Sequence, residues 1–157
     1  MVRGLAGNSR LTQMPPETIA IASDHAGVDL KSTLKEELAA LGFEVLDLGT
    51  QDKESVDYPD MADALANAID DHQASRGVAI CGSGIGISMA ANRHRHIRAA
   101  LCHDTLSAKL AREHNDANVL ALGARLIGTE TARDCLRTFL STPYEGGRHQ
   151  RRVDKMS

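Results

Sequence analysis

Short apolar runs alternate along this chain with longer segments in which apolar residues recur every three or four positions. The first run, Thr18 to Ser23 (TIAIAS), is apolar on both faces, as in a strand buried inside a parallel sheet. Four more runs of this kind are Phe43 to Leu48, Gly77 to Cys81, Ile97 to Leu101 and Asn118 to Leu122. The pattern therefore predicts five buried strands.

Amphipathic segments lie between and after these strands. The first has leucines at spacings of four, four and three residues, and it ends at Gly42: Leu30, Leu34, Leu38 and Leu41. A second helix is expected after Pro59, with Met61, Leu65 and Ile69 on one face. Further helices are expected over residues 85–92, 104–114 and 129–140, with Asp104 as an N-cap.

Strands that alternate with helices in this way are joined by right-handed crossovers. We therefore expect an α/β fold: a three-layer α/β/α sandwich, Rossmann-like, with a five-stranded, mostly parallel sheet. Ligands of such sheets bind beyond the carboxyl ends of the strands, where the winding changes direction. This rule selects Asp24 and His25 after the first strand, Cys81 to Gly86 after the third, and Arg125 after the fifth.

Composition places the chain among globular proteins. It has 157 residues, 42% of them hydrophobic and 25% charged, which fits one domain with one sizeable core. The net charge of −3 and the absence of tryptophan argue against a general nucleic-acid surface. No apolar run approaches the roughly 20 residues of a membrane helix, so we expect no membrane partner.

Residues 1–17 are interpreted as a flexible N-terminal extension, with Met14 as an alternative start. They lack the continuous apolar core of a signal peptide. Residues 18–157 are expected to form a single domain with a basic C-terminal tail. The three cysteines are odd in number and lack metal-ligand spacing, which favours a reducing compartment and a cytoplasmic protein.

The segment from Val78 to Gly86 passes from an apolar strand through the thiol of Cys81 into a glycine-rich loop that opens a helix. Bare backbone N–H groups and the positive end of a helix dipole suit an anion or an anionic transition state. The dinucleotide fingerprint needs a glycine at position 87, where this chain has Ile87, and the P-loop ending is absent. The helix start would favour the Cys81 thiolate as a general base, whereas the alternative is a small core residue.

Other candidates each have a structural alternative. For Asp24 and His25 the alternative is a pair that only caps a helix, and for His114 and Asn115 it is a helix end with Asn115 as the C-cap. His94 and His96 resemble a zinc pair, but no third ligand is evident, so no metal site is expected. Cys102 and Cys135 are assigned to packing.

The tail from Gly146 to Arg152 is a basic cluster on two glycines in an otherwise slightly acidic chain. It is either a solvated charged tail or a set of phosphate-binding arginines, because guanidinium groups match phosphate oxygens in a bidentate way.

Three separated motifs resemble one family. They are CGSGIGISMAAN at residues 81–92, REHNDANVL at residues 112–120 and GGRHQRRV at residues 146–153. Together they resemble type B ribose-5-phosphate isomerase, in a family that also includes galactose-6-phosphate isomerase subunits. The resemblance runs from about Thr18 to Val153.

The resemblance implies a role for each matching residue. Cys81 matches the base that moves a proton between C2 and C1 of the open-chain sugar, and Ser83 matches the hydroxyl that shuttles protons between the oxygens. His114 matches the acid for ring opening, and Asp24 faces the ring hydroxyl. Some members of the family carry a glutamate at the position of Ile87 instead of the cysteine, so this chain resembles the cysteine subtype.

The resemblance also implies the substrate contacts. The anion hole for the enediolate is matched by Gly82, Gly84, Ile85 and Gly86. Other sugar contacts are matched by His25, Tyr58 and Asn115, and the phosphate contacts by Arg125, Arg148 and Arg152. Neither a cofactor nor a metal is implied, and family members form homodimers with shared sites; the sequence leaves a tetramer open.

The function expected from these residues is a cofactor-independent aldose–ketose isomerase that interconverts ribose 5-phosphate and ribulose 5-phosphate in the pentose phosphate pathway. One alternative is an isomerase of a six-carbon sugar phosphate, allose or galactose 6-phosphate. A third hypothesis is a non-catalytic nucleotide-binding module on the same scaffold.

Overall fold

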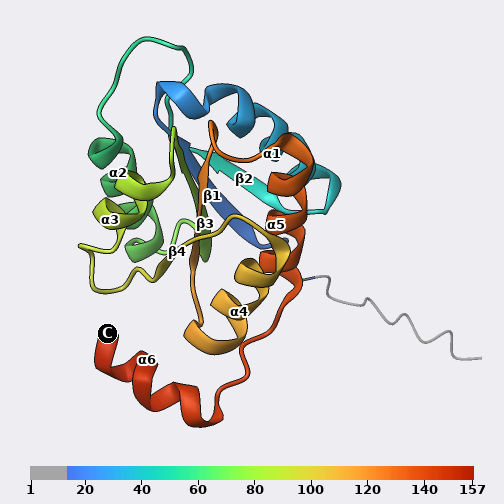
Figure 1. Ribbon diagram of the computed structural model, residues 1–157, viewed down its shortest axis with the longest axis vertical. Helices are drawn as coiled ribbons and strands as arrows, with labels where there is room; N and C mark the ends of the chain where they lie inside the picture. Colours follow the sequence, from blue (N-terminus) through green and yellow to red (C-terminus); the bar gives the residue numbers. More distant parts are fainter. Residues whose placement is uncertain (1–13) are drawn as a thin grey trace, which may run out of the picture.

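A computed structural model describes residues 14–157 of the chain (Figure 1). Five parallel strands form one sheet in the order β2-β1-β3-β5-β4. The strands are β1 (Thr18–Ser23), β2 (Glu44–Asp47), β3 (Arg76–Cys81), β4 (Ala99–Leu101) and β5 (Val119–Gly123). The predicted α/β fold is confirmed, with a sheet that is parallel throughout.

Helices cover both faces of this sheet. They are α1 (Val28–Ala40), α2 (Tyr58–Asp70), α3 (Ile85–Ala91), α4 (Thr105–Asn115), α5 (Thr129–Ser141) and α6 (Gln150–Met156), with the short 3₁₀ helices η1 (His25–Gly27) and η2 (Gly147–His149). The core contacts place α1, α4 and α5 on one face and α2 and α3 on the other. These are the three layers of the predicted sandwich.

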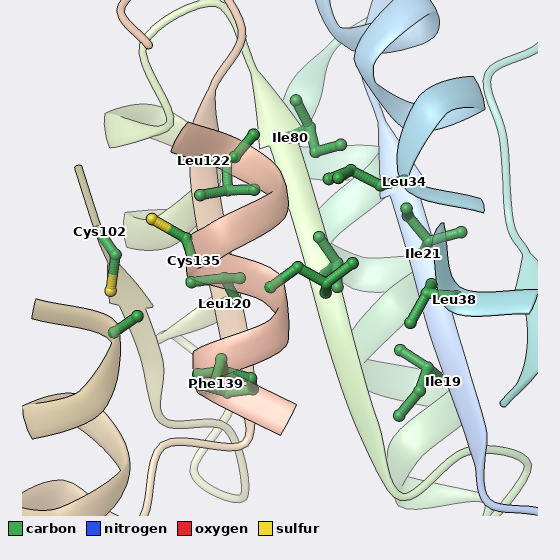
Figure 2. Packing of buried hydrophobic residues seen from close by; sticks show 14 of the residues in the cluster. Ile19, Ile21, Leu34, Leu38, Ile80, Cys102, Leu120, Leu122, Cys135 and Phe139 are labelled. Atoms are coloured by element: carbon green, nitrogen blue, oxygen red, sulfur yellow. The ribbon is translucent and has the colours of Figure 1, made fainter. Parts of the chain in front are cut away.

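Successive strand residues point to opposite faces, which divides the core in two. One half joins the branched residues of the strands, such as Ile19 and Ile21, to Leu34 of α1 and Phe139 of α5 (Figure 2). In the other half the strands contribute mainly small residues, such as Ala20, against α2 and α3. Small side chains let these two helices approach the sheet closely.

The helix α4 has the predicted start. Asp104 accepts a hydrogen bond from the backbone N–H of Ser107 over 2.7 Å, as part of a capping box. At the other end Asn115 is the last helical residue, and Asp116 is the C-cap with φ 46°. The helix therefore ends one residue later than the alternative interpretation of Asn115 placed it.

Two segments differ from the sequence prediction. The strand expected from Ile97 begins at Ala99, because the N–H of Ile97 donates to His94 O over 3.0 Å and closes a turn. The C-terminal tail, for which the sequence predicted no helix, contains η2 and α6. In α6 only Val153 is buried, so the sequence shows no apolar periodicity there.

Glu17, assigned from sequence to the N-terminal extension, forms a two-pronged ion pair with Arg76 of β3. The Nε and Nη2 atoms of Arg76 each lie 2.8 Å from one carboxylate oxygen of Glu17. These hydrogen bonds lower the pKa of Glu17 below its ordinary value. The rest of the predicted extension up to residue 13 lies outside the described residues.

Within residues 14–157, no helix is long and apolar enough to cross a membrane.

Candidate functional site

The site lies where the chain leaves neighbouring strands toward opposite faces of the sheet. After β1 it continues to α1 on one face, and after β3 it continues to α3 on the other. Such a switch point opens a crevice beyond the carboxyl ends of the strands. A pocket of about 330 Å³ lies there, lined by Asp24, Tyr58, Cys81, Gly82, Ser83, Gly86, Arg125 and Leu126.

Cys81 is the last residue of β3, and only 4% of its surface is exposed. Its Sγ accepts a hydrogen bond from the backbone N–H of Gly84 over 3.1 Å. Its carbonyl accepts one from the N–H of Ala124 over 2.9 Å, which ties the strand end to the turn after β5. The strand end and the hydrogen bond from Gly84 thus fix the position of the sulfur beside the glycine loop.

The loop after Cys81 requires glycine because it packs against the end of β5. Gly84 has φ +77°, and a Cβ there would lie 2.5 Å from Leu101 Cδ1 and 2.8 Å from the backbone carbon of Leu122. A Cβ on Gly123 would lie 2.4 Å from the carbonyl oxygen of Ser83. The loop and the strand thus meet backbone to backbone.

Tyr58 and Arg125 form two walls of the pocket. A Cβ on Gly86 would lie 2.6 Å from Cζ of Tyr58, so the aromatic ring rests directly on the start of α3. The backbone N–H of Arg125 donates to the carbonyl of Gly82 over 2.9 Å, and its guanidinium lies beside the same glycine. A fixed cation therefore borders the glycine loop, where it can bind an anionic group.

Asp24 and His25 lie in the turn after β1. Asp24 is buried, and its Oδ1 accepts the N–H of Ala26 over 3.0 Å, so it does cap η1 as the structural alternative held. This hydrogen bond involves Oδ1 alone, one of the two carboxylate oxygens of Asp24. Nδ1 of His25 accepts the backbone N–H of Val56 over 3.2 Å.

The sequence analysis missed an ion-pair cluster between α1 and the end of β2. Lys31, 2% exposed, and Lys35 place their Nζ atoms 2.6 Å and 2.7 Å from the two oxygens of Asp47. Burial would raise the pKa of Asp47, but the hydrogen bonds from both lysines and from the N–H of Gly49 lower it well below its ordinary range. The signal was a lysine in the apolar stripe of α1, and the cluster fixes the start of the loop that leads to Tyr58.

The remaining predicted residues lie at the opposite end of the sheet. His114 and Asn115 end α4, and Arg148 and Arg152 lie on η2 and α6, which Figure 1 shows at the lower end beside α4. In the sheet, Cys81 lies beside Gly123, the last residue of β5. The helix α4 instead connects to Val119, the first residue of β5. Four residue steps, about 13 Å at 3.3 Å per residue, separate those two positions of β5. Within one chain, these four residues therefore do not join the Cys81 pocket.

His114 has a partner that sequence reasoning missed. Its ring stacks on that of His149, with centroids 4.3 Å apart and planes 16° from parallel. Nε2 of the buried His149 lies 3.5 Å from Oε2 of Glu145. The only sequence signal was a histidine between the arginines of the tail motif.

Two groups of side chains in residues 14–157 contain residue types that bind metal ions. One ligand atom each from His114, Glu145 and His149 lies within 4.8 Å of the others. The stacked rings of His114 and His149 hold their nitrogen lone pairs in nearly parallel planes. Tetrahedral coordination needs the lone pairs to converge on one ion, so this arrangement does not suit a metal. The predicted non-ligands His94 and His96 contact Asp63 over 2.8 Å and the carbonyl of Ala66 over 2.7 Å.

Cys102 and Cys135 are buried in the core beneath α4 and α5, in agreement with the assignment to packing (Figure 2). Burial raises the pKa of both thiols, that of Cys135 to about 11. A buried thiol with a raised pKa forms little thiolate, which is the reactive form of cysteine.

Known proteins that are similar to this chain include sugar phosphate isomerases. Residues 19–156 match the family described as Ribose/Galactose Isomerase. Ribose-5-phosphate isomerase B of Escherichia coli is 45% identical over 139 residues, covering 88% of this chain and 93% of that protein. D-erythrulose-4-phosphate isomerase of Pectobacterium atrosepticum is 44% identical over 140 residues, covering 88% of this chain and 92% of that protein.

Solved structures lead to the same family. The ribose 5-phosphate isomerase of Thermotoga maritima superposes with a TM-score of 0.87 and is 53% identical, covering 89% of this chain and 97% of that one. The Clostridium thermocellum Ribose-5-Phosphate Isomerase B superposes with a TM-score of 0.87 and is 47% identical, covering 88% of this chain and 94% of that one. The resemblance inferred from three sequence motifs is confirmed: this chain belongs to the ribose/galactose isomerase family.

Proposed function

We propose that this enzyme interconverts ribose 5-phosphate and ribulose 5-phosphate through an enediolate, as a step of the pentose phosphate pathway. The observation that carries the proposal is the place of the Cys81 thiol. It lines a pocket beside a glycine loop, and its Sγ accepts a hydrogen bond from the backbone N–H of Gly84 over 3.1 Å. Family membership supports an aldose–ketose isomerisation. The names of the Escherichia coli and Thermotoga maritima relatives support the five-carbon substrate.

The first step opens the furanose ring. His114 donates a proton to the ring oxygen as the bond from C1 to that oxygen breaks, and Asp24 accepts the proton of the C1 hydroxyl. Arg125, Arg148 and Arg152 hold the phosphate, which places C1 and C2 next to Cys81.

The second step moves one proton between carbons. The Cys81 thiolate removes the proton from C2, and the electron pair forms the enediolate double bond while negative charge develops on O1. N–H groups of the loop from Gly82 to Gly86 stabilise that charge. Ser83 transfers a proton from O2 to O1, and the Cys81 thiol returns its proton to C1. The result is a ketone at C2 and an alcohol at C1.

Ring opening by His114 and phosphate binding by Arg148 and Arg152 require a second copy of the chain. Cys81 and His114 lie at opposite ends of one sheet, so we place His114, Asn115, Arg148 and Arg152 of one subunit at the Cys81 pocket of its partner in a homodimer. Exposed apolar side chains on the segments that follow β3, β4 and β5 support such an interface: Ile85 (45% exposed), Met89 (63%), Leu106 (63%) and Leu126 (57%). Three free cysteines suit the reducing cytoplasm in which we place the enzyme.

A coupled assay with ribose 5-phosphate tests the activity. We expect Cys81→Ser and Cys81→Ala to lose at least about 10³-fold in kcat, while calorimetry shows that both still bind the sugar phosphate. A Cys81→Ala variant with near-normal turnover would refute the assignment of the base.

Mixing two inactive variants tests the shared site. Cys81→Ala and His114→Gln homodimers are unfolded together and refolded, so that about half of the dimers are mixed. Each mixed dimer contains one intact site, and we expect about a quarter of the wild-type activity per chain to return. No recovery, with mixed dimers verified by mass spectrometry, would place both residues in one subunit's site.

The six-carbon alternative is tested by parallel kinetics on ribose 5-phosphate, allose 6-phosphate and galactose 6-phosphate. We expect the highest kcat/KM with the five-carbon substrate. Membership in a sugar isomerase family disfavours the nucleotide-binding hypothesis.

A further inference from the structure

The proposed ring-opening acid, His114, lies in a small cluster built by the C-terminal segment of its own chain. His149, at the end of η2, covers one face of the His114 ring with centroids 4.3 Å apart. His149 is 8% exposed, so its ring is itself held by packing. The cluster lies outside the Cys81 pocket, and the mechanism above gives His149 no chemical step.

The segment that carries His149 is fastened to the end of α4. The backbone N–H of Glu145 donates to the carbonyl of Glu113 over 3.1 Å, and Nε of Arg112 donates to the carbonyl of Thr142 over 3.3 Å. Two bonds thus connect the chain on either side of Pro143 to the turn of α4 that contains His114. The stack therefore does not depend on a freely moving tail.

Glu145 adds a contact that orients His149. Its Oε2 lies 3.5 Å from Nε2 of His149, four residues along the chain. A carboxylate beside one ring nitrogen is a common way to fix how an imidazole is turned. Glu145, His149 and His114 then form a sequence of contacts from a carboxylate, through a buried ring, to the proposed acid.

Orientation matters for His114 because the ring-plane torsion of histidine has a broad energy minimum. An unsupported ring at a half-buried helix end would sample many directions, and few of them point a nitrogen at the ring oxygen of a sugar. Misplacement of a catalytic group by about 1 Å can cost about 10²-fold in rate.

We propose that His149, oriented by Glu145, is a positioning residue that stacks on His114 and aims it at the ring oxygen of the substrate. The inference rests on the proposed function, since it concerns the acid of that reaction. His149 makes no contact with the reacting atoms and acts only through His114.

Kinetics of the full-length enzyme on ribose 5-phosphate test this role. We expect His149→Ala to lower kcat by about 10- to 100-fold and to leave KM within about twofold. His149→Phe keeps a flat ring above His114 and should recover most of the loss, which also guards against a variant that fails to fold. Gln150→Ala, a change at the next residue, serves as the matched control and should leave both constants unchanged.

A double-mutant cycle separates positioning from a general structural role. In a His114→Gln background, His149→Ala should cause no further loss, because the residue through which it acts is gone. An equal loss in both backgrounds would overturn the proposal. A rise in KM with unchanged kcat would also overturn it, since that result would assign His149 to phosphate binding beside Arg148.

Nuclear magnetic resonance gives a readout that does not need activity. The Hε1 signal of His114 is assigned by its absence in His114→Gln. Because the two rings are stacked, this signal should move downfield in His149→Ala and back in His149→Phe. An unmoved signal would show that the rings do not stack in solution. A wild-type enzyme without isomerase activity, but with this shift, would overturn the proposed function and leave the stack standing.

Discussion

The backbone N–H of Val56 donates a hydrogen bond to Nδ1 of His25 over 3.2 Å, which joins the turn after β1 to the long loop before α2. An accepting Nδ1 carries no proton, so the proton of the neutral ring lies on Nε2. His25 is thereby a hydrogen-bond donor at Nε2, beside the buried Asp24. The same bond holds the loop that ends at Tyr58, a wall of the pocket.

Two substitutions of His25 separate these roles. An asparagine oxygen takes about the place of Nδ1, so His25→Asn should keep the Val56 bond but lose the Nε2 donor. We expect KM for ribose 5-phosphate to rise about tenfold, equivalent to a hydrogen bond of about 1.4 kcal/mol, with the exchange rate of the Val56 amide unchanged. His25→Gln should instead speed exchange of that amide. Identical behaviour of the two variants would contradict this division.

Gly84→Ala should damage the site although it adds only a single methyl group. The residue has φ +77°, and the new Cβ would lie within 2.9 Å of the backbone of Leu122 and Gly123. We expect a loss of about 10²-fold or more in kcat and about 1–3 kcal/mol in the free energy of unfolding. Steady-state kinetics and urea denaturation measure these two losses.

Gly128→Ala is the matched control for this change. No heavy atom lies within 4 Å of a Cβ built there, and its φ of −76° is ordinary. It should leave both quantities near their wild-type values. A Gly84→Ala variant that behaves in the same way would refute the backbone-to-backbone packing of the loop.

Apolar patterning was enough to predict the framework that holds the Cys81 loop. The run from Thr18 to Ser23 forms β1 without an error at either end, because buried parallel strands are continuously apolar. The helix α6 was not predicted, because it lacks an apolar pattern of its own. Its seven residues bury only Val153, so tertiary contacts and not an apolar face define it.

The sequence named candidate site residues but not their places in the fold. Cys81 and His114 were both candidates, yet their separation depends on the direction of α4, which returns the chain to the amino end of β5. The His149 stack and the Lys31–Asp47 pair depend on contacts between distant segments. A local pattern can mark one partner of such a contact but does not name the other.

Thiol labelling should distinguish the three cysteines. Cys81 lines the pocket, whereas Cys102 and Cys135 are buried in the core, where burial raises the pKa of both thiols. In native protein at pH 8 we expect iodoacetamide to modify only Cys81, and ribose 5-phosphate to slow this reaction. Peptide mass spectrometry measures each site. In urea all three should react, and early labelling of Cys102 would contradict the assignment.

Acid should weaken the fold through Asp47. Hydrogen bonds from Lys31 and Lys35 lower the pKa of this carboxyl despite its burial, so its folded-state pKa lies below the unfolded value of about 3.9. Its contribution to stability is therefore complete above about pH 5 and is lost as the pH falls toward the folded-state pKa. At pH 7, Asp47→Asn leaves the buried Lys31 without its carboxylate, and we expect a loss of about 3 kcal/mol in the free energy of unfolding.

Urea denaturation at pH 7 and pH 3 measures this linkage. The difference between wild type and Asp47→Asn should shrink at pH 3, because the wild-type carboxylate then contributes less. Asp29→Asn is the control: its pair with Lys53 spans 3.0 Å, but the side chains are 81% and 71% exposed, so little change is expected. A difference that stays constant between the two pH values would mean that the charge of Asp47 does not stabilise the fold. In that case the two lysines would hold the loop before Tyr58 by packing alone.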